Sequence, residues 1–294
     1  MTENTAAQDT QTAGRIVVGV DFSENAVRAA DWAAREAADR GLELHVVHAL
    51  DLPGAMGELT EPAGYVKAGH VAGENLLGKI VAVIREKDPG LTVTSEVSEL
   101  DAAQTLVQLS RNAQLIVTGT RGHGGFAGML LGSVSLKLAA HAHCPAVVVR
   151  GEQAGEPLNE IVLGVESDQA EAPIRFAFET AAKLGATLTA VRAWWPQTGY
   201  GGYYFVEDLE GREEAEKADM ADLLKAVRAD YPEVTVTTAT VRGNAVPMLI
   251  GASQGTRLLV VGSHHHHGPL SVGGYVVQGL LAHSPTPVAV VPIM

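Results

Sequence analysis

The chain has 294 residues, enough for two domains of ordinary size, and its composition is globular, with 46% hydrophobic and 19% charged residues. A net charge of −13 argues against nucleic acid or an anionic membrane as the main partner. It leaves room for a phosphate ligand, which backbone amides bind without basic side chains. A single cysteine, Cys144, excludes an intrachain disulfide and favours a reducing compartment.

The first thirteen residues, Met1 to Ala13, are polar and lack an apolar centre. They predict a disordered leader and not a signal peptide. No apolar run in the chain reaches the length that spans a membrane. These features together predict a soluble cytoplasmic protein.

Short β-branched runs alternate with helical patterns through the first half of the chain. The runs predict strands near 15–20, 43–49, 92–97, 114–118 and 146–150. Apolar residues at helical spacing predict helices over Ala26–Arg40, Glu74–Lys87, Ala102–Arg111 and Ser133–Ala142. Strands without polar alternation, separated by helices, predict a parallel sheet covered on both faces, with right-handed crossovers.

The second half of the chain repeats the first in four segments that occur in the same order. Gly14–Ser23 returns as Asn159–Asp168, Ala37–Val47 as Ala181–Val191, Leu115–Gly119 as Leu258–Gly262, and His141–Val149 as His283–Val291. The repeat predicts one α/β domain over residues 14–150 and another over 159–294. Residues 151–158, rich in Gly, Glu and Pro, form the predicted linker. We expect two tandem, doubly wound domains, each with a five-stranded parallel sheet of the Rossmann-like class.

Sheets of this class bind ligands beyond the carboxyl ends of their strands, where the strand order reverses. Asp21, Ala49 and Gly119 each follow a predicted strand of the first half directly. We therefore expect these three residues to lie at one edge of the sheet.

Two glycine-bearing segments follow the fourth predicted strand, in the pattern Gly119-x2-Gly122-x9-Gly132-Ser133. Glycines let backbone N–H groups approach phosphate oxygens, and the N-terminus of a helix adds partial positive charge. Ser133 stands at the expected N-cap, where its hydroxyl and amide can both address an anion. The pattern is neither a Walker loop nor the compact dinucleotide fingerprint.

This motif resembles the nucleotide signature of ATP-binding universal stress proteins, and the resemblance extends over nearly the whole chain as two tandem units. It implies that Asp21 contacts the adenosine part of ATP and that the backbone at Ala49 faces the adenine edge. Thr118 and Gly119 would flank the ribose. The phosphates would lie against Gly122, Gly132, Ser133 and Val134, with Ser135 as a further contact. Gly19, which ends the first strand, completes the predicted site, and the cofactor would be ATP, alone or with Mg²⁺.

Each part of the motif also has a purely structural interpretation. A glycine after a strand is more often a plain turn, and Gly132-Ser133 alone is an ordinary helix start. Asp21 alone is more often the cap of the helix that follows it. The joint spacing, inside a repeat that also places Asp21 after its first strand, favours the nucleotide interpretation.

The second half departs from this pattern at three positions. Glu166 stands in place of Asp21, His265 in place of Gly122, and Tyr275 in place of Ser133. A side chain at position 265 would obstruct the approach of backbone to phosphate, and Tyr275 lacks a small cap hydroxyl. The sequence therefore predicts a degenerate second crevice and one tight ATP per chain.

Other features of the sequence admit simpler interpretations. The run His264–His267 predicts adventitious metal affinity, because structural zinc sites need four ligands at set spacing. Cys144 is interpreted as a small buried hydrophobe. Trp194-Trp195 and the stretch Tyr200–Phe205 could cover a site or fill an unused crevice. The dense charge on one side of the helix Glu207–Arg228 is interpreted as a solvated face.

The leading hypothesis for function is an ATP-binding regulatory protein of the stress response, whose nucleotide state sets its conformation or its protein partners. A slow ATPase or nucleotidyl transferase is the second, although Arg121 is the only basic residue inside the motif and His123 the only base beside it. A ligand-free interaction module is the third, and the complete motif of the first half argues against it. We expect no enzymatic activity beyond slow ATP hydrolysis.

The closing strands, Ala146–Arg150 and Val288–Ile293, would be exposed sheet edges if each half stood alone. The resemblance implies that such strands pair antiparallel. The pairing could join the two halves of one chain as a pseudo-dimer, or join two chains as a homodimer.

Overall fold

The computed structural model describes residues 14–50, 62–122, 131–151, 156–195, 208–263 and 274–293. The predicted leader, residues 1–13, and half of the predicted linker, residues 152–155, lie outside these ranges. The first half contains β1 (Arg15–Gly19), α1 (Glu24–Arg40), β2 (Glu43–Ala49), α2 (Pro62–Lys87), β3 (Val93–Ser98), α3 (Ala102–Leu109), the short 3₁₀ turn η2 (Ser110–Asn112), β4 (Leu115–Gly119), α4 (Ser133–His141) and β5 (Ala146–Val149). The second half contains β6 (Leu158–Gly164), α5 (Glu171–Leu184), β7 (Thr187–Trp194), α6 (Leu209–Asp230), β8 (Val236–Arg242), α7 (Ala245–Ala252), β9 (Thr256–Ser263), α8 (Tyr275–His283) and β10 (Val288–Pro292).

Local sequence signals account for the ends of the helix that follows β1. Ser23 caps α1, because its Oγ accepts a hydrogen bond from the backbone N–H of Ala26 at 3.2 Å. Gly41 ends α1 in the left-handed conformation with φ of 65°, which a residue without a side chain adopts at little cost. Gly185 ends α5 in the same way, with φ of 58°. The repeat seen in the sequence therefore includes the C-terminal glycine caps of α1 and α5 as well as the strands.

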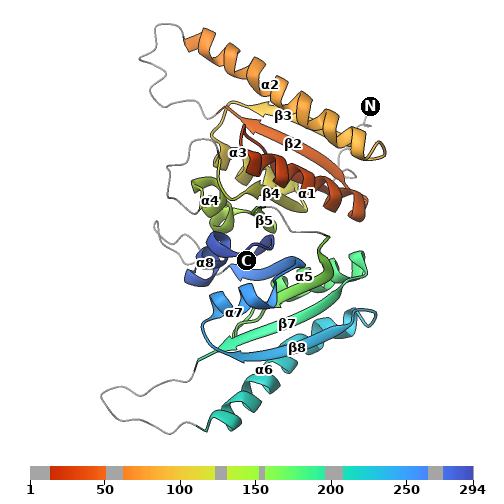
Figure 1. The fold of residues 1–294 in the computed structure, drawn as a ribbon, viewed down its shortest axis with the longest axis vertical. Helices are drawn as coiled ribbons and strands as arrows, with labels where there is room; N and C mark the ends of the chain where they lie inside the picture. The colour runs from red at the N-terminus through yellow and green to blue at the C-terminus, as the bar shows by residue number, and fades with distance from the viewer. Residues whose placement is uncertain are drawn as a thin grey trace, which may run out of the picture.

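The ten strands form one sheet in the order β3-β2-β1-β4-β5-β10-β9-β6-β7-β8. Within each half every paired strand is parallel, and helices cover both faces, which confirms the predicted α/β class. Figure 1 shows the first half above the second, with α2 and α6 at opposite ends of the molecule. Each half reverses its strand order between its first and fourth strands, β1 and β4 or β6 and β9.

The two halves are joined through their closing strands. β5 and β10 pair antiparallel, with Val148 opposite Val288 and Ala146 opposite Val290. This confirms the predicted pairing in its intrachain form. Each of the two strands also has a parallel neighbour on its other side, so neither offers a free edge to a second chain. Among the described strands, β3 and β8 are the edges of the sheet.

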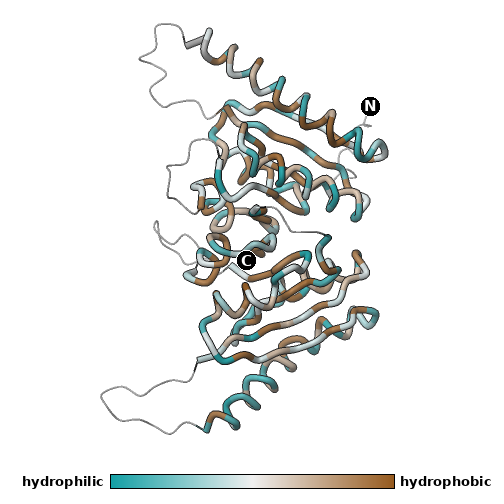
Figure 2. The backbone as a smooth tube through the Cα atoms, viewed as in Figure 1, coloured by the Kyte–Doolittle hydropathy of each residue, from teal (hydrophilic) through white to brown (hydrophobic). Residues whose placement is uncertain are grey.

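The core runs through both halves without interruption. One buried cluster combines strand residues of the two domains with the inner faces of α1 and α5, and it includes Val147, Phe178 and Ala289. A second lies on the opposite face, where α4 packs near α7 and α8 over β10. Figure 2 shows hydrophobic colour along the strands and hydrophilic colour along much of α6. The halves therefore share one folded body.

Cys144 is buried, as expected, and burial raises the pKa of its thiol to about 12. The pKa of this thiol is higher in the folded protein than in the unfolded chain. Its contribution to the free energy of unfolding is therefore full below about pH 8.5 and is lost as the pH rises from there toward 12. We expect the folded protein to react with iodoacetamide at pH 8 on the order of a thousandfold more slowly than the unfolded chain, since only the thiolate reacts. Mass spectrometry of timed alkylation with and without denaturant measures this ratio, and equal rates would contradict the burial.

Candidate nucleotide site

The candidate site lies at the carboxyl end of β1 and β4, the two strands between which the order of the first half reverses. β1 pairs with both β2 and β4, so the loops after these three strands lie at one edge. Asp21 follows β1, Ala49 ends β2 and Gly119 ends β4. The topology thus brings together the three residues that the sequence placed at strand ends.

Asp21 lies against the glycine loop that follows β4. Its Oδ1 accepts a hydrogen bond from the backbone N–H of Ser23 at 2.9 Å. A Cβ at Gly122 would overlap the Oδ2 of Asp21. Glycine at position 122 leaves the Asp21 carboxylate room in its present position, whereas a larger residue would require that side chain to move.

The loop after β1 is also bound to the backbone of the glycine loop. The Ser23 hydroxyl and the Asn25 amide each donate to the carbonyl oxygen of Arg121, at 3.4 Å. A Cβ at Gly119 would lie 3.0 Å from backbone atoms of Asn25, so Gly119 permits the N-terminus of α1 to approach β4. Gly19, at the end of β1, permits a similar close approach on the other face of the sheet. A Cβ there would lie 2.6 Å from the Leu106 side chain of α3.

The second arm of the motif returns to the same loop. The backbone N–H of Gly132 donates to the carbonyl oxygen of Thr120 at 2.7 Å. Gly132, and not Ser133, is the N-cap of α4, with φ of −81° and ψ of 155°. The predicted cap was wrong by one residue, because the hydrogen bond to Thr120 holds Gly132 in the extended conformation that a cap requires. Ser133 is the first residue of the helix and is exposed. The backbone N–H groups of Ser133 and Val134 are in the first turn of α4, where donors have no acceptor within the helix.

Ser135 and Thr118 support the loop from below. Ser135 is buried, and its hydroxyl donates to the carbonyl oxygen of Gly119 at 2.9 Å. The buried Thr118 hydroxyl donates to the same carbonyl at 3.4 Å. In this conformation Ser135 holds the loop in place, a different role from the phosphate contact predicted for it.

His48 is a residue of the site that sequence reasoning missed. It lies in β2 one residue before Ala49, is buried, and contacts the loop that carries Asp21. Its Nδ1 lies 2.9 Å from the carbonyl oxygen of Val20, which can only accept, so Nδ1 carries the proton. The exposed Phe22 ring meets the imidazole edge-on, with centroids 5.4 Å apart. The signal available in the sequence was a histidine inside an otherwise apolar strand end.

Arg150 was also missed, because it is remote from the motif in sequence. The pairing of β4 with β5 sets Gly119 beside Val149, and the N–H of Thr120 donates to the carbonyl oxygen of Val149 at 3.2 Å. Arg150 therefore lies next to Thr120 and close to Arg121. Burial lowers the pKa of the Arg150 guanidinium, and so does the positive charge of Arg121 nearby. Two cations thus gather beside the glycine loop of a strongly acidic protein.

The equivalent region of the second half is arranged differently. Gly274 is the N-cap of α8, and Tyr275, its first residue, is 75% exposed. Pro292 of β10 occupies the position that corresponds to Arg150. His265, the run His264–His267 and the stretch Tyr200–Phe205 lie outside the described residues. The described ranges contain no group of three or more His, Cys, Asp or Glu that could hold a metal ion.

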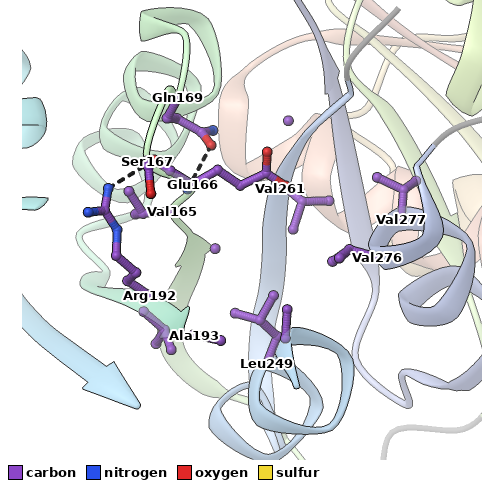
Figure 3. Close-up of a pocket in the computed structure, with 14 residues that line it drawn as sticks. Val165, Glu166, Ser167, Gln169, Arg192, Ala193, Leu249, Val261, Val276 and Val277 are labelled. Atoms are coloured by element: carbon purple, nitrogen blue, oxygen red, sulfur yellow. Dashed lines mark hydrogen bonds between the residues drawn. The ribbon is translucent and has the colours of Figure 1, made fainter. Parts of the chain in front are cut away.

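A pocket of about 250 Å³ opens at the carboxyl ends of β6, β7 and β9 in this second half (Figure 3). Its walls come from Val165, Ala193, Leu249, Val261, Val276 and Val277, and its polar residues include Glu166, Ser167, Gln169 and Arg192. Trp194, beyond Ala193, is buried, whereas Trp195 is exposed.

These features define a protein of two Rossmann-like α/β domains, each with a reversal of strand order, and with a pocket at that reversal in the second. The universal stress protein family matches residues 12–150 and 158–292, and the chain belongs to this family. Universal stress protein Rv2623 of Mycobacterium tuberculosis is 32% identical over 93% of this chain and 95% of its own length. A universal stress protein of Mycolicibacterium smegmatis is 31% identical over 86% and 88%, respectively.

Among solved structures, a universal stress protein from Archaeoglobus fulgidus superposes with a TM-score of 0.71. It covers 95% of this chain and 98% of its own, at 17% identity, a likeness that concerns the fold. None of the described helices is both long enough and apolar enough to cross a membrane.

Proposed function

We propose that this chain is an ATP-binding regulatory protein of the stress response, in which the first-domain crevice holds the nucleotide and its occupancy sets conformation or partner binding. One observation carries the proposal. The two arms of the glycine motif converge, with Gly122 against Asp21 and Gly132 against the Thr120 carbonyl, where a Cβ would occupy the space between them. Close packing of two glycine segments beside a helix N-terminus supports a polyphosphate ligand.

The hydrogen-bond donors around these two arms, Gly122 and Gly132 with the start of α4, which we call the cradle, fit a triphosphate. The N-terminus of α4 contributes open N–H groups and a partial positive charge of about half an electron. Arg121, in the glycine loop, and Arg150, beside it at the end of β5, add full positive charges close to the loop. The Asp21 carboxylate, beside Gly122, and the backbone at the end of β2 near Ala49 lie along the same edge of the sheet, and they are suited to a ribose and an adenine edge.

The nucleotide content of the natively purified chain is the first test. We expect about one ATP per chain by mass spectrometry and by calorimetric titration of stripped protein. The full chain is required, because separating the halves would expose the apolar edges of β5 and β10. Absence of ATP after purification together with no heat of ATP binding would refute the proposal. A turnover number near the ordinary enzyme range, about 1 s⁻¹ or more, would favour the ATPase alternative.

Arg150→Gln tests the phosphate end separately. We expect ATP affinity to fall about 10- to 150-fold, because a hydrogen bond from a charged donor contributes about 1.5–3 kcal/mol. Adenosine affinity should stay unchanged, since adenosine lacks phosphate. The matched control is Arg242→Gln, which removes an exposed arginine at the end of edge strand β8. Equal losses for ATP and adenosine would mean that Arg150 only supports the fold.

A further inference from the structure

A groove of about 440 Å³ lies between the two halves of the chain, at the amino ends of the strands. Trp32, Glu36 and Asp39, at helical spacing on one side of α1, form its first wall. The other wall comes from the second half, from the end of α5, the residues before β6 and the start of β9. Figure 1 shows α1 and α5 on either side of this junction. The volume falls within the range of about 300–1,000 Å³ that is typical of small-molecule sites.

The two carboxylates on the α1 wall are already paired. Arg257 of β9 donates through Nη2 to Glu36 at 3.0 Å and to Asp39. Glu36 also pairs with Arg40, so positive and negative charge balance within this group. Both hydrogen bonds that Arg257 forms with described residues use Nη2. Its Nη1 and Nε can therefore donate to an acceptor in the groove.

Lys183 and Glu156 supply charges of opposite sign that are not paired. Both line the groove and are exposed, Lys183 in the last turn of α5 and Glu156 before β6. Neither forms an ion pair with any residue that the structure describes. The carbonyl end of α5 adds little negative charge, because Asn159 Nδ2 donates to the carbonyls of Leu184 and Gly185 at 3.2 and 3.1 Å. The groove thus offers one ammonium and one carboxylate to a ligand.

Trp32, Pro157 and Leu184 supply the apolar part of the groove. All three are half-buried and line it. Trp32 and Leu184 also pack against the main core cluster, which holds them in place. An apolar group of a ligand would cover their remaining surface, and an indole offers a large and rigid contact area.

We infer that this groove is a binding site for a small zwitterion, of the class of free apolar α-amino acids. The ligand carboxylate pairs with Lys183 and the open N–H groups of Arg257, the ammonium pairs with Glu156, and the side chain packs on Trp32. A ligand without net charge suits a groove whose charges balance. Because it contacts α1 of one half and α5 of the other, it stabilises their junction. The inference does not rest on ATP binding, since the glycine motif lies at the opposite edge of the sheet.

Tryptophan fluorescence of the full-length chain tests the chemistry of the ligand. The chain has three tryptophans, so substituting Trp194 and Trp195 by phenylalanine leaves Trp32 as the reporter. With L-phenylalanine as the probe, we expect a saturable change at millimolar concentration or below. Phenylethylamine lacks the carboxylate, phenylpropionate lacks the ammonium and glycine lacks the ring. Each should need roughly tenfold higher concentration, because each loses one of the three contacts.

Lys183→Gln and Glu156→Gln test the two charges one at a time, and both residues are exposed, so the fold is preserved. Lys183→Gln should weaken phenylalanine binding about tenfold and leave the response to phenylethylamine unchanged. Glu156→Gln should weaken phenylalanine binding likewise and leave the response to phenylpropionate unchanged. Lys225→Gln, at an exposed lysine of α6 outside the groove, is the matched control.

Three results would each overturn the inference. They are no saturable change up to millimolar phenylalanine, equal responses to phenylalanine and its two singly charged analogues, and equal affinities in Lys183→Gln and Lys225→Gln. Calorimetric titration of the same variants with ATP reports on the first-domain site separately.

Discussion

Replacing Glu36 by alanine is expected to lower the free energy of unfolding by about 3–5 kcal/mol, the usual result of removing one partner from a buried ion pair. Glu36 of α1 is 2% exposed and pairs with two arginines. Arg40 donates from Nε to its Oε1 at 2.6 Å, and Arg257 of β9 donates to its Oε2 at 3.0 Å. Because Arg40 is also buried, the substitution would leave its positive charge without this partner.

The same cluster crosses from the first half to the second. Arg257 belongs to the second half, and Arg40 reaches Thr180 of α5 at 3.3 Å. Arg40 also lies 5.8 Å from the centroid of the Phe176 ring. We therefore expect Glu36→Ala to weaken the coupling of the halves as well as the first domain.

Urea denaturation followed by circular dichroism measures both effects of Glu36→Ala. The matched control is Asp39→Ala, because Asp39 also binds Arg257 but is 47% exposed. Screening by water limits such a pair to about 1 kcal/mol or less. A loss for Glu36→Ala no larger than that for Asp39→Ala would contradict the buried linkage. A single cooperative transition with an unchanged slope would contradict weakened coupling.

The fold could be predicted because its signals are local and occur twice. Apolar runs, helix caps and the glycine turns at Gly41 and Gly185 recur in both halves, so each half supports the interpretation of the other. The start of α2 was placed near Glu74, whereas the helix begins at Pro62. Its first turns are rich in small residues that give weak helical periodicity. A Cβ at Gly73 would meet His48, which shows that this part of α2 packs closely on β2.

The candidate site could be predicted only where its residues adjoin the motif. Arg150 and His48 reach it through strand register and burial, which one-dimensional spacing does not encode. Ser135 has the residue type of an anion contact, but helical rotation turns its hydroxyl toward the Gly119 carbonyl. The hydrogen bond of Gln169 depends on the conformation of the loop that follows β6. The ion pair of Arg192 depends on how α6 packs against β7.

Gly132→Val is expected to weaken ATP binding by about 1–3 kcal/mol, or roughly 5- to 150-fold, comparable to leaving a buried polar contact unmade. A Cβ at Gly132 would lie 3.2 Å from the Thr120 carbonyl oxygen and 3.5 Å from the Cα of Arg121. A β-branched side chain needs still more room, so it would push the start of α4 away from the glycine loop. The helix N–H donors would then no longer converge with that loop on one phosphate group.

Gly274→Val supplies the control, because Gly274 caps α8 as Gly132 caps α4. Among the residues that the structure describes, a Cβ there would meet nothing within 4 Å, so valine is not expected to displace the helix. Both substitutions remove a glycine from a helix N-cap, where glycine is weakly favoured. The difference in ATP affinity between the two variants therefore reports the effect of crowding between Gly132 and the glycine loop. Calorimetric titration of both folded variants with ATP decides the matter. An unchanged affinity for Gly132→Val, or equal losses in the two variants, would mean that the two arms of the motif do not hold the phosphates.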